Sequence, residues 1–483
     1  MTFQPLDALT NAATHHPEGL FYADSEQSLT FAEARDTSTQ LASQLRLMGV
    51  TAGDTVAIDL PIGMQVLFTY ACFHLAAVSA SVNRHSLPDG VIWDWWLSTS
   101  APGGQPSDGT LLARCVGIID NEFFIRASGL STTLTAVPYE SDDSVCRIAL
   151  TSGTTGRPKA IGLTVSTVEH RANEAEKLFI DDKPFLSALG LSTTSGFHTL
   201  IAGTRSGLPY LAPGTATLNR DTIRRHAVSA IKASPQQLIE LFAASSPPDL
   251  ETLRVINSAG GAPTQGLVDS IRAKSAARIV NLYGSSEAGR AAEAVLGDTV
   301  DAMFAGAVVP TTTVQVVDGG GEVPAGVVGE IRYRAPNIAT TYLGDEVATA
   351  TAFRHGWFYP GDRGRLDNGG HLFLSGRVSD TINAGGVKID PSVVEQFARS
   401  LNGVSESLGF THSPETGVSQ FVLAVSGTEL NLREIAQKLE AQFGNARPAS
   451  VFAVPDIPRT ETGKLSRYLT AELYADSVNR ANR

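Results

Sequence analysis

The sequence predicts an α/β fold in at least two domains, a large N-terminal one and a small C-terminal one. The chain has 483 residues, more than a single compact core usually holds. Helical and extended patterns alternate from residue 30 to about residue 290, as they do in parallel sheets covered by helices. A glycine-rich stretch at Arg377–Gly386 then precedes about a hundred residues with helices and strands of their own, which suits a separate α+β domain.

The first elements follow this alternation. Phe31–Met48 carries apolar residues at helical spacing, Thr55–Leu60 is a short apolar strand, and Gln65–Ser79 is again helical. Leu67–Ala80 is the most apolar stretch, but it is too short and mixed to span a membrane, so we expect a buried helix. Cys146–Leu150 is a strand that runs straight into a glycine-rich loop.

The pattern changes near residue 306. Before it, Ser229–Lys232, Arg254–Asn257 and Arg278–Leu282 are short apolar strands that continue the parallel arrangement. After it, Thr313–Val317 and Val327–Arg332 flank a Gly-Gly-Gly turn, and because no helix follows the glycines we interpret the segment as a hairpin rather than a nucleotide-binding loop. In the last segment we expect helices at Pro391–Leu401 and Leu432–Phe443, and strands at Gln420–Val425 and Ser450–Val454.

The composition excludes several kinds of partner. A formal net charge of −12 argues against nucleic acids and anionic membrane surfaces, because both require a basic face. Any anionic substrate must therefore be held by local groups. Cys72, Cys115 and Cys146 are odd in number and lack metal-ligand spacing, which indicates reduced thiols and a cytoplasmic protein. No basic segment followed by an apolar run opens the chain, so we expect no signal peptide.

The glycine-rich loop Thr151-Ser-Gly-Thr-Thr-Gly-Arg-Pro-Lys159 carries the strongest chemical signal. Its glycines let backbone N–H groups approach an anion, its hydroxyls add donors, and Arg157 and Lys159 add positive charge. The spacing GxxxxGK[ST] occurs nowhere in the chain, so this is not a Walker A loop. The residues expected to hold phosphate are Thr151, Ser152, Gly153, Thr154, Thr155, Gly156 and Lys159.

Six further segments add to this loop. In chain order they are Ser258-Ala-Gly-Gly-Ala-Pro263, Asn281-Leu-Tyr-Gly-Ser-Ser-Glu-Ala-Gly289, Gly329-Glu-Ile331, Trp357-Phe-Tyr-Pro-Gly-Asp362, the pairs Gly376-Arg377 and Gly385-Gly386, and Arg459-Thr-Glu-Thr-Gly-Lys-Leu-Ser-Arg467. Together with the loop they resemble, in the same order, the motifs of the superfamily of acyl-CoA synthetases, peptide-synthetase adenylation domains and luciferases. The chain looks most like the acyl-CoA ligases, and the resemblance extends from about residue 21 to residue 467.

This resemblance implies ATP-dependent activation of a carboxylic acid to acyl-AMP, then transfer of the acyl group to a thiol. It implies an adenylation domain at residues 1–378 with a small β-barrel beside its sheets, and a mobile C-terminal domain at residues 379–483. Lys464 is expected to offset the negative charge that develops when a carboxylate attacks the α-phosphate. Glu287 is expected to bind Mg²⁺, and the Ser286 hydroxyl to contact a phosphate oxygen.

Other matching positions are expected to bind ATP and AMP. Tyr283 offers a flat face to adenine, Asp362 can accept both ribose hydroxyls, and Arg377 can add donors beside them. The remaining nucleotide positions implied by the motifs are Gly260, Gly261, Ala262 and Gly284.

The acid pocket is expected at Thr193, Gly196, Phe197 and Gly284. Thr193 stands where many CoA ligases have His and amino-acid activators have Asp, so an amino acid is disfavoured. The lining otherwise looks uncharged, which favours an aliphatic or aromatic acid. His198 is interpreted as a structural histidine within a helix.

For the second half-reaction, transfer of the acyl group to a thiol, the resemblance implies fewer residues. Ser379 stands at the expected hinge, where the family commonly has Asp or Lys, and Gly385 and Gly386 mark the expected thiol tunnel. Coenzyme A is preferred as the acceptor only because it is the commoner thiol in the family; an acyl carrier protein stays open, as does the adenylation of an amino acid for such a carrier. A luciferase-like monooxygenase and an inactive binding relative are further alternatives, and the sequence leaves the oligomeric state open.

Overall fold

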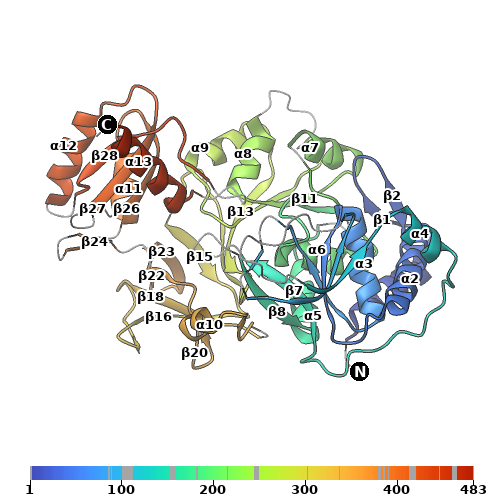
Figure 1. Cartoon of the computed structure of the whole chain (residues 1–483). Coiled ribbons are helices and arrows are strands. Elements are labelled where there is room, and N and C mark those ends of the chain that lie inside the picture. Colours follow the sequence, from blue (N-terminus) through green and yellow to red (C-terminus); the bar gives the residue numbers. More distant parts are fainter. Residues whose placement is uncertain are drawn as a thin grey trace.

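Two large mixed sheets carry the fold, and helices cover them (Figure 1). No helix in the part of the chain described below is long and apolar enough to cross a membrane. The computed structural model describes residues 3–84, 87–88, 90–100, 113–151, 158–180, 183–214, 216–243, 250–301, 303–336, 338–378, 382–384, 387–389, 391–412, 420–444, 447–459 and 465–481.

The first sheet has seven strands, and its centre is parallel as predicted. Its strands, in spatial order, are β19 (Tyr342–Leu343), β8 (Lys159–Thr164), β7 (Val145–Thr151), β4 (Val78–Ser81), β3 (Thr55–Asp59), β5 (Trp93–Ser98) and β6 (Ala113–Ile118). Helices α2 (Phe31–Met48), α3 (Ile62–His74) and α4 (Asn121–Ser128) share an apolar core with this sheet.

The second sheet has thirteen strands and changes from parallel to antiparallel along its width. Its parallel part is β9 (Phe185–Ser187), β11 (Ala230–Ala233), β12 (Val255–Ala259) and β13 (Arg278–Ser285). Its antiparallel part is β14 (Gly289–Val295), β15 (Phe304–Val308), β23 (His371–Arg377), β22 (Asp362–Leu366), β18 (Gly329–Arg334), β16 (Thr313–Asp318) and β17 (Gly321–Glu322), with β20 (Phe353–Arg354) and β21 (Trp357–Phe358) joined to β18.

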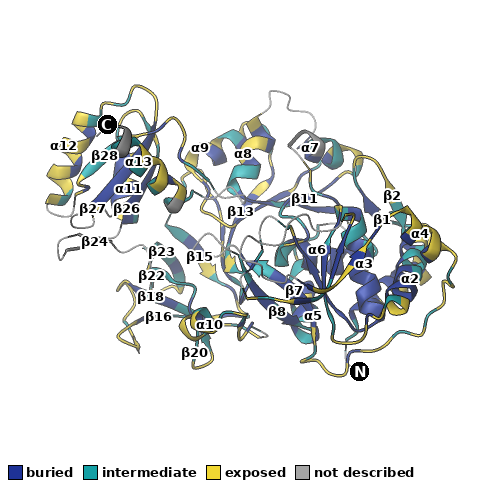
Figure 2. Cartoon of the chain, in the orientation of Figure 1, coloured by how far each residue is buried: buried dark blue, intermediate teal, exposed yellow. Residues whose placement is uncertain are grey.

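Helices fill both faces of this second sheet. α5 (Val165–Glu176) and α6 (Thr194–Arg205) pack together in the main core beside α1 (Pro5–His15). α7 (Ala216–Arg225), α8 (Pro235–Ala243) and α9 (Gln265–Arg272) cover the other face of the parallel strands. Figure 2 shows the resulting pattern, with buried central strands and exposed residues on outward helix faces such as that of α4. The smaller elements are β1 (Leu20–Ala23), β2 (Ser28–Thr30), β10 (Tyr210–Leu211) and α10 (Glu346–Ala352).

The sequence predicted most of these elements but misplaced one helix end. α2 occupies its predicted residues, where Thr30 and Glu33 form a capping box and Gly49 ends the helix in a left-handed conformation. The helix predicted to reach Ser79 ends at His74, because Ala76 turns the chain with φ of 51° and the apolar residues after it form β4. Apolar character alone could not separate the buried helix from the buried strand that follows it.

The antiparallel strands also confirm the predicted hairpin. β16 pairs with β17 across the Gly319–Gly320 turn and with β18 along its length. These strands were expected to form a small β-barrel; in the described residues they continue the parallel strands in one sheet that runs from β9 to β17.

The C-terminal segment has its own sheet, drawn in orange and red in Figure 1. It also has its own apolar cores. α11 reaches back to the large sheet, and its Ser392 hydroxyl donates to the Ser375 carbonyl of β23. The elements are β24 (Ile382–Ala384), β25 (Val387–Ile389), α11 (Pro391–Arg399), β26 (Val404–His412), β27 (Gln420–Gly427), α12 (Leu432–Phe443), β28 (Ser450–Ala453) and α13 (Arg467–Ala481). The four elements predicted from the sequence here are all present.

Candidate functional site

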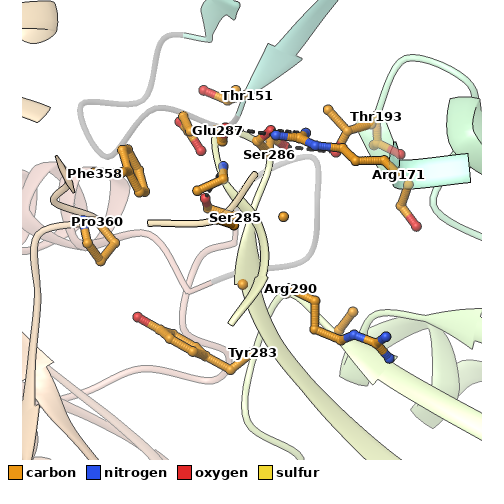
Figure 3. A pocket seen from close by; sticks show the side chains of 18 of the residues that line it. Thr151, Arg171, Thr193, Tyr283, Ser285, Ser286, Glu287, Arg290, Phe358 and Pro360 are labelled. Carbon is orange, nitrogen blue, oxygen red and sulfur yellow. Dashed lines mark hydrogen bonds between the residues drawn. The ribbon is translucent and has the colours of Figure 1, made fainter. Parts of the chain in front are cut away.

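A cavity of about 820 Å³ lies where the carboxyl ends of β11, β12 and β13 face α5, α6 and the antiparallel strands. Open α/β sheets commonly bind ligands at this edge, because the strand ends present loops and helix N-termini there. Figure 3 shows side chains from both large sheets turned toward this space. Most of the described residues predicted from the motifs line it.

The glycine-rich loop connects two strands whose ends are neighbours. Thr151 ends β7, Lys159 begins β8, and the two residues are register partners in an antiparallel pair. Both line the cavity, and the Lys159 ammonium lies 4.5 Å from the centre of the Tyr342 ring. Ser152, Gly153, Thr154, Thr155 and Gly156, predicted to hold phosphate, lie outside the described residues.

The turn between β13 and β14 brings Ser286 and Glu287 to the cavity. Glu287 is 8% exposed, and its Oε1 accepts a hydrogen bond of 2.8 Å from the Tyr342 hydroxyl. Burial and the neighbouring Glu287 carboxylate raise the pKa of Tyr342, so the tyrosine stays a donor. Gly284 is required at this turn, because a Cβ there would lie 2.3 Å from the Gly289 carbonyl oxygen.

Arg171 of α5 holds the same turn through two hydrogen bonds. Its guanidinium donates to the carbonyl oxygens of Ser286 at 2.6 Å and Glu287 at 2.8 Å, the bonds drawn as dashed lines in Figure 3. Burial lowers the pKa of Arg171 to about 10, well above neutral pH, so the bracing group remains a cation. The backbone that carries Ser286 and Glu287 is thus held by charge-assisted hydrogen bonds.

The arrangement of Glu287 fits a magnesium ligand. Mg²⁺ usually binds one or two protein carboxylates together with phosphate oxygens and water. Glu287 provides one such carboxylate on the wall of the cavity that Thr151 and Lys159, the ends of the glycine-rich loop, also line. Within the described residues no group of three or more His, Cys, Asp and Glu side chains is placed to hold a metal ion.

A second cluster joins Tyr283, Asp362 and Arg377. Asp362 begins β22 and Arg377 ends β23, and the two are register partners. The Tyr283 hydroxyl donates to Oδ2 of Asp362 at 2.6 Å, while Nε of Arg377 lies 3.1 Å from Oδ1. Burial, together with the Asp362 carboxylate, raises the pKa of Tyr283. All three residues line the cavity, so the predicted ribose-binding carboxylate is held in one orientation before any ligand arrives.

The predicted adenine-side residues are only partly brought together. Gly260, at the end of β12, lines the cavity and adopts φ of 88°, which favours glycine. Gly261 and Ala262 are exposed and do not contribute to the lining.

Only some of the predicted acid-pocket residues line the cavity. Thr193 lines the cavity, but it is the N-cap of α6: its hydroxyl accepts from the Gly196 N–H at 3.0 Å and donates to the Gly190 carbonyl at 2.9 Å. Gly196 is required because a Cβ would lie 1.8 Å from the Gly190 carbonyl oxygen. Phe197 is fully buried in the core and does not line the cavity, whereas His198, one residue later, does.

The cavity also contains charged residues that the sequence analysis missed, which corrects the expectation of an uncharged lining. Lys232 stands inside a short buried strand, and Arg171 stands on the apolar stripe of a helix; a charge in either position is a signal that could have been noticed. Tyr342 and Arg290 carry no such local signal. The charged or titratable lining residues not predicted are His170, Arg171, Glu174, His198, Lys232, Arg290, Glu330, Tyr342, Asp345 and Tyr359.

Four predicted residues of the C-terminal region have no structural assignment. Ser379, Gly385, Gly386 and Lys464 lie outside the described residues. Their predicted roles, at the hinge, the thiol tunnel and the catalytic step, stay predictions.

Comparison with known proteins extends over the whole chain. A 2-succinylbenzoate–CoA ligase of Bacillus subtilis is 26% identical over 480 residues and spans 97% of both chains. An indoleacetate–CoA ligase of Aromatoleum aromaticum is 27% identical over 485 residues, which cover 93% of this chain and 94% of the relative.

Solved structures show the same fold. ATP-bound MatB from Rhodopseudomonas palustris superposes with a TM-score of 0.83 at 19% identity, over 99% of this chain and 100% of that one. The O-succinylbenzoate coenzyme A synthetase of Bacillus subtilis, in complex with ATP and magnesium ion, superposes with a TM-score of 0.78 at 24% identity, over 95% and 98%. The family model of the AMP-binding enzymes matches residues 9–92 and 104–343, more than half of the sequence. The chain therefore belongs to the AMP-binding enzyme family.

Proposed function

We propose that this protein is an ATP-dependent acid–CoA ligase. A carboxylate oxygen of the acid attacks the α-phosphorus of ATP, the bond to pyrophosphate breaks, and acyl-AMP forms. The thiol of coenzyme A then attacks the acyl carbon, loses its proton, and releases AMP as the thioester forms. The observation that carries the proposal is the single cavity that Lys159, Glu287 and Asp362 share.

Different residues of the cavity are proposed to bind different parts of ATP. Lys159, at the end of the glycine-rich loop, supplies positive charge to the phosphates. Asp362, oriented by Tyr283 and Arg377, accepts from the ribose hydroxyls through lone pairs that its two protein partners do not use. Fixed donors and charges of this kind lower the barrier because they need no rearrangement when charge develops on the reacting phosphate.

Glu287 would hold Mg²⁺, which when bound neutralises phosphate charge and polarises the phosphorus for attack. Its buried position and its hydrogen bond from Tyr342 favour the fit, because the carboxylate is already oriented toward the cavity. Lys464 is proposed as the cation that offsets charge at the α-phosphate, and it lies outside the described residues.

The choice of coenzyme A is supported by the relatives. They are named as CoA ligases, and the similarity to them covers nearly their whole length. We also propose that residues 379–483 form a mobile C-terminal domain, which rotates between one orientation for adenylation and another for thioester formation. Ser379 would be at the hinge, and Gly385 and Gly386 at the thiol tunnel. Cys72 and Cys146 are buried free thiols, which supports a reducing compartment such as the cytoplasm.

The test is a pyrophosphate-release assay over aliphatic, aryl and amino acids with Mg·ATP, each with and without coenzyme A. The protein should release pyrophosphate with at least one acid and consume the free thiol when coenzyme A is present. Glu287→Gln should lower kcat/KM by about 100-fold or more, because it removes the metal-binding charge. Glu122→Gln, on the exposed face of α4, is the control and should match wild type. Pyrophosphate release without thioester formation would redirect the second step to a carrier protein.

A further inference from the structure

Lys232 occupies an unusual place in the parallel part of the large sheet. In β11 it follows Ala230 by two residues, so both side chains lie on one face, and its register partners are Ser187 of β9 and Asn257 of β12. Ala230 belongs to an apolar cluster with Phe185 on this face. The Lys232 ammonium is therefore carried into the cavity from an apolar wall.

Two arginines of the cavity already have partners. Arg290 pairs with Glu174 at 3.0 Å and with Glu293 at 2.8 Å, and Arg171 donates to two carbonyl oxygens. The Lys232 backbone is hydrogen-bonded within the sheet, but no hydrogen bond or ion pair joins its ammonium to another residue in the part of the chain that the structure describes. Burial, with a smaller contribution from Arg290, lowers the pKa of Lys232 to about 8, so the ammonium form still predominates at neutral pH.

Two residues of α6 that line the same space each carry a buried polar atom without a partner in the described structure. His198 is 5% exposed and its Nε2 has no hydrogen bond in the described structure; Oγ of Ser195, one turn earlier on the helix, is also buried without a partner. Burial first, and then the positive charges of Arg171 and Lys232, lower the pKa of His198, which places the imidazole within the field of the Lys232 ammonium. Buried polar groups of native proteins are nearly always hydrogen-bonded, so these two atoms point to a missing ligand.

The cavity that these groups line also has apolar residues on its wall. Leu178, Leu189 and Leu282 line the cavity near α5, β9 and β13. A ligand that fits them has a hydrocarbon or aromatic body, and a ligand that satisfies the polar atoms ends in a group with negative charge and several acceptor lone pairs.

We propose that the acid activated by this protein carries a second carboxylate, which pairs with Lys232 and is hydrogen-bonded by Ser195 and His198. The inference rests on the proposed function and narrows its substrate to dicarboxylic acids with an apolar body. The first carboxylate reacts at the α-phosphate while the second neutralises the Lys232 ammonium. A carboxylate placed there also draws a proton onto Nε2 of His198, because it opposes the burial and the two cations that otherwise keep the imidazole neutral.

The experiment compares matched acids that differ only in the second carboxylate. Pyrophosphate release is measured with succinate, adipate, suberate, homophthalate and 2-succinylbenzoate, and with butyrate, hexanoate, octanoate, phenylacetate and 3-benzoylpropionate as their respective monoacid counterparts. Wild type is compared with Lys232→Met and with the control Lys438→Met, an exposed lysine of α12 whose partner is Glu434. Thermal stabilisation by each acid is recorded in parallel, because this reads binding without turnover.

Wild type and Lys438→Met should favour at least one diacid over its monoacid counterpart by about 100-fold in kcat/KM. Lys232→Met should lose about 100-fold on that diacid and little or nothing on the monoacid, with the same selective loss of thermal stabilisation. Ser195→Ala should lose about tenfold on the diacid alone. An equal loss on mono- and diacids, or a wild type that prefers monoacids, would overturn the proposal.

The two proposals fail separately. If no acid releases pyrophosphate but diacids still stabilise wild type and not Lys232→Met, the dicarboxylate site holds and the ligase assignment falls. If no acid releases pyrophosphate and no diacid stabilises the protein, both fall.

Discussion

Two basic side chains project from the two large sheets, and their surroundings differ. Arg147 of β7 is 1% exposed and donates to the hydroxyls of Thr69, Ser79 and Ser81 at 3.4, 3.2 and 2.8 Å and to the Leu191 carbonyl at 3.0 Å. Its guanidinium also lies 4.6 Å from the centre of the Phe197 ring. Lys232 of β11 faces the cavity, and within the described residues its ammonium has no such contacts.

The difference distinguishes a structural cation from one placed for a ligand. Removing an ion from water is unfavourable, and the protein offsets this for Arg147 with neutral oxygens and an aromatic face. Even so, burial lowers the pKa of Arg147 to about 10. In the described part of the chain no such set of acceptors contacts the Lys232 ammonium, so a ligand with negative charge would offset the cost of removing this cation from water.

The largest expected effect comes from removing the structural cation. Arg147→Met should lower the free energy of unfolding by about 3 kcal/mol, because it leaves three hydroxyls and the Leu191 carbonyl buried with one partner fewer. Urea unfolding followed by fluorescence measures this change. Arg126→Met, which removes an exposed arginine of α4 paired with Glu122, should change it by no more than about 0.5 kcal/mol. If the Arg147→Met protein were as stable as wild type, Arg147 would not be a structural cation, and the proposed difference between Arg147 and Lys232 would be wrong.

The next effect should have the opposite sign. Lys232→Met should raise the free energy of unfolding of the ligand-free protein by about 1 to 2 kcal/mol, because it replaces an unpaired cation on an apolar wall with an apolar side chain of similar length. The same urea titration measures it. Destabilisation as large as that of Arg147→Met would show that Lys232 has a structural partner.

The pH dependence should separate diacids from monoacids. Since the folded pKa of Lys232 is about 8, the ammonium is lost as pH rises through 8, and the ratio of kcat/KM for a diacid to that for its monoacid should fall about tenfold by pH 9. The ratio cancels the pH dependence that both acids share. A ratio that stays constant from pH 7 to pH 9 would contradict the ion pair. Arg290 and His198 interact electrostatically with this ammonium, and Glu174, Arg171 and His170 are further charged or titratable groups that line the same cavity.

The smallest effect concerns Thr193, a cavity residue whose hydroxyl already has partners. Thr193→Ala should destabilise the protein by about 1 kcal/mol through loss of the helix cap, with no change in the preference between mono- and diacids. Thr264→Ala, which removes the equivalent cap of α9, should have a similar effect on stability. A change in acid preference on Thr193→Ala alone would assign this hydroxyl to the substrate.

The sequence predicted the fold well where periodicity and caps agreed. α2 is an example, since apolar spacing, a capping box and a terminal glycine all indicate the same bounds. The end of α3 was missed because buried helix and buried strand are both apolar there. The continuous sheet from β9 to β17 depends on pairings between β15 and β23, far apart in sequence, which no local pattern reveals.

The candidate site was predictable where motifs end strands and unpredictable where single side chains enter from helices. Ser286, Glu287 and Asp362 sit at strand ends, and their positions follow from the motifs. On α6, by contrast, the cavity-lining residues are Thr194, Ser195, His198 and Thr199, one face of the helix, while Phe197 lies on the opposite face. The helical period, applied to this segment, would have predicted His198 rather than Phe197 as a cavity residue.

Tyr342 separates two groups of opposite charge that would otherwise attract each other. Its ring faces the Lys159 ammonium, while its hydroxyl holds the Glu287 carboxylate. A direct ion pair between them would have to be broken each time a polyphosphate and its metal entered. With the tyrosine between them, the lysine can bind phosphate oxygens and the glutamate can bind a cation. The ligand-free site therefore keeps both charges instead of forming an ion pair between Lys159 and Glu287.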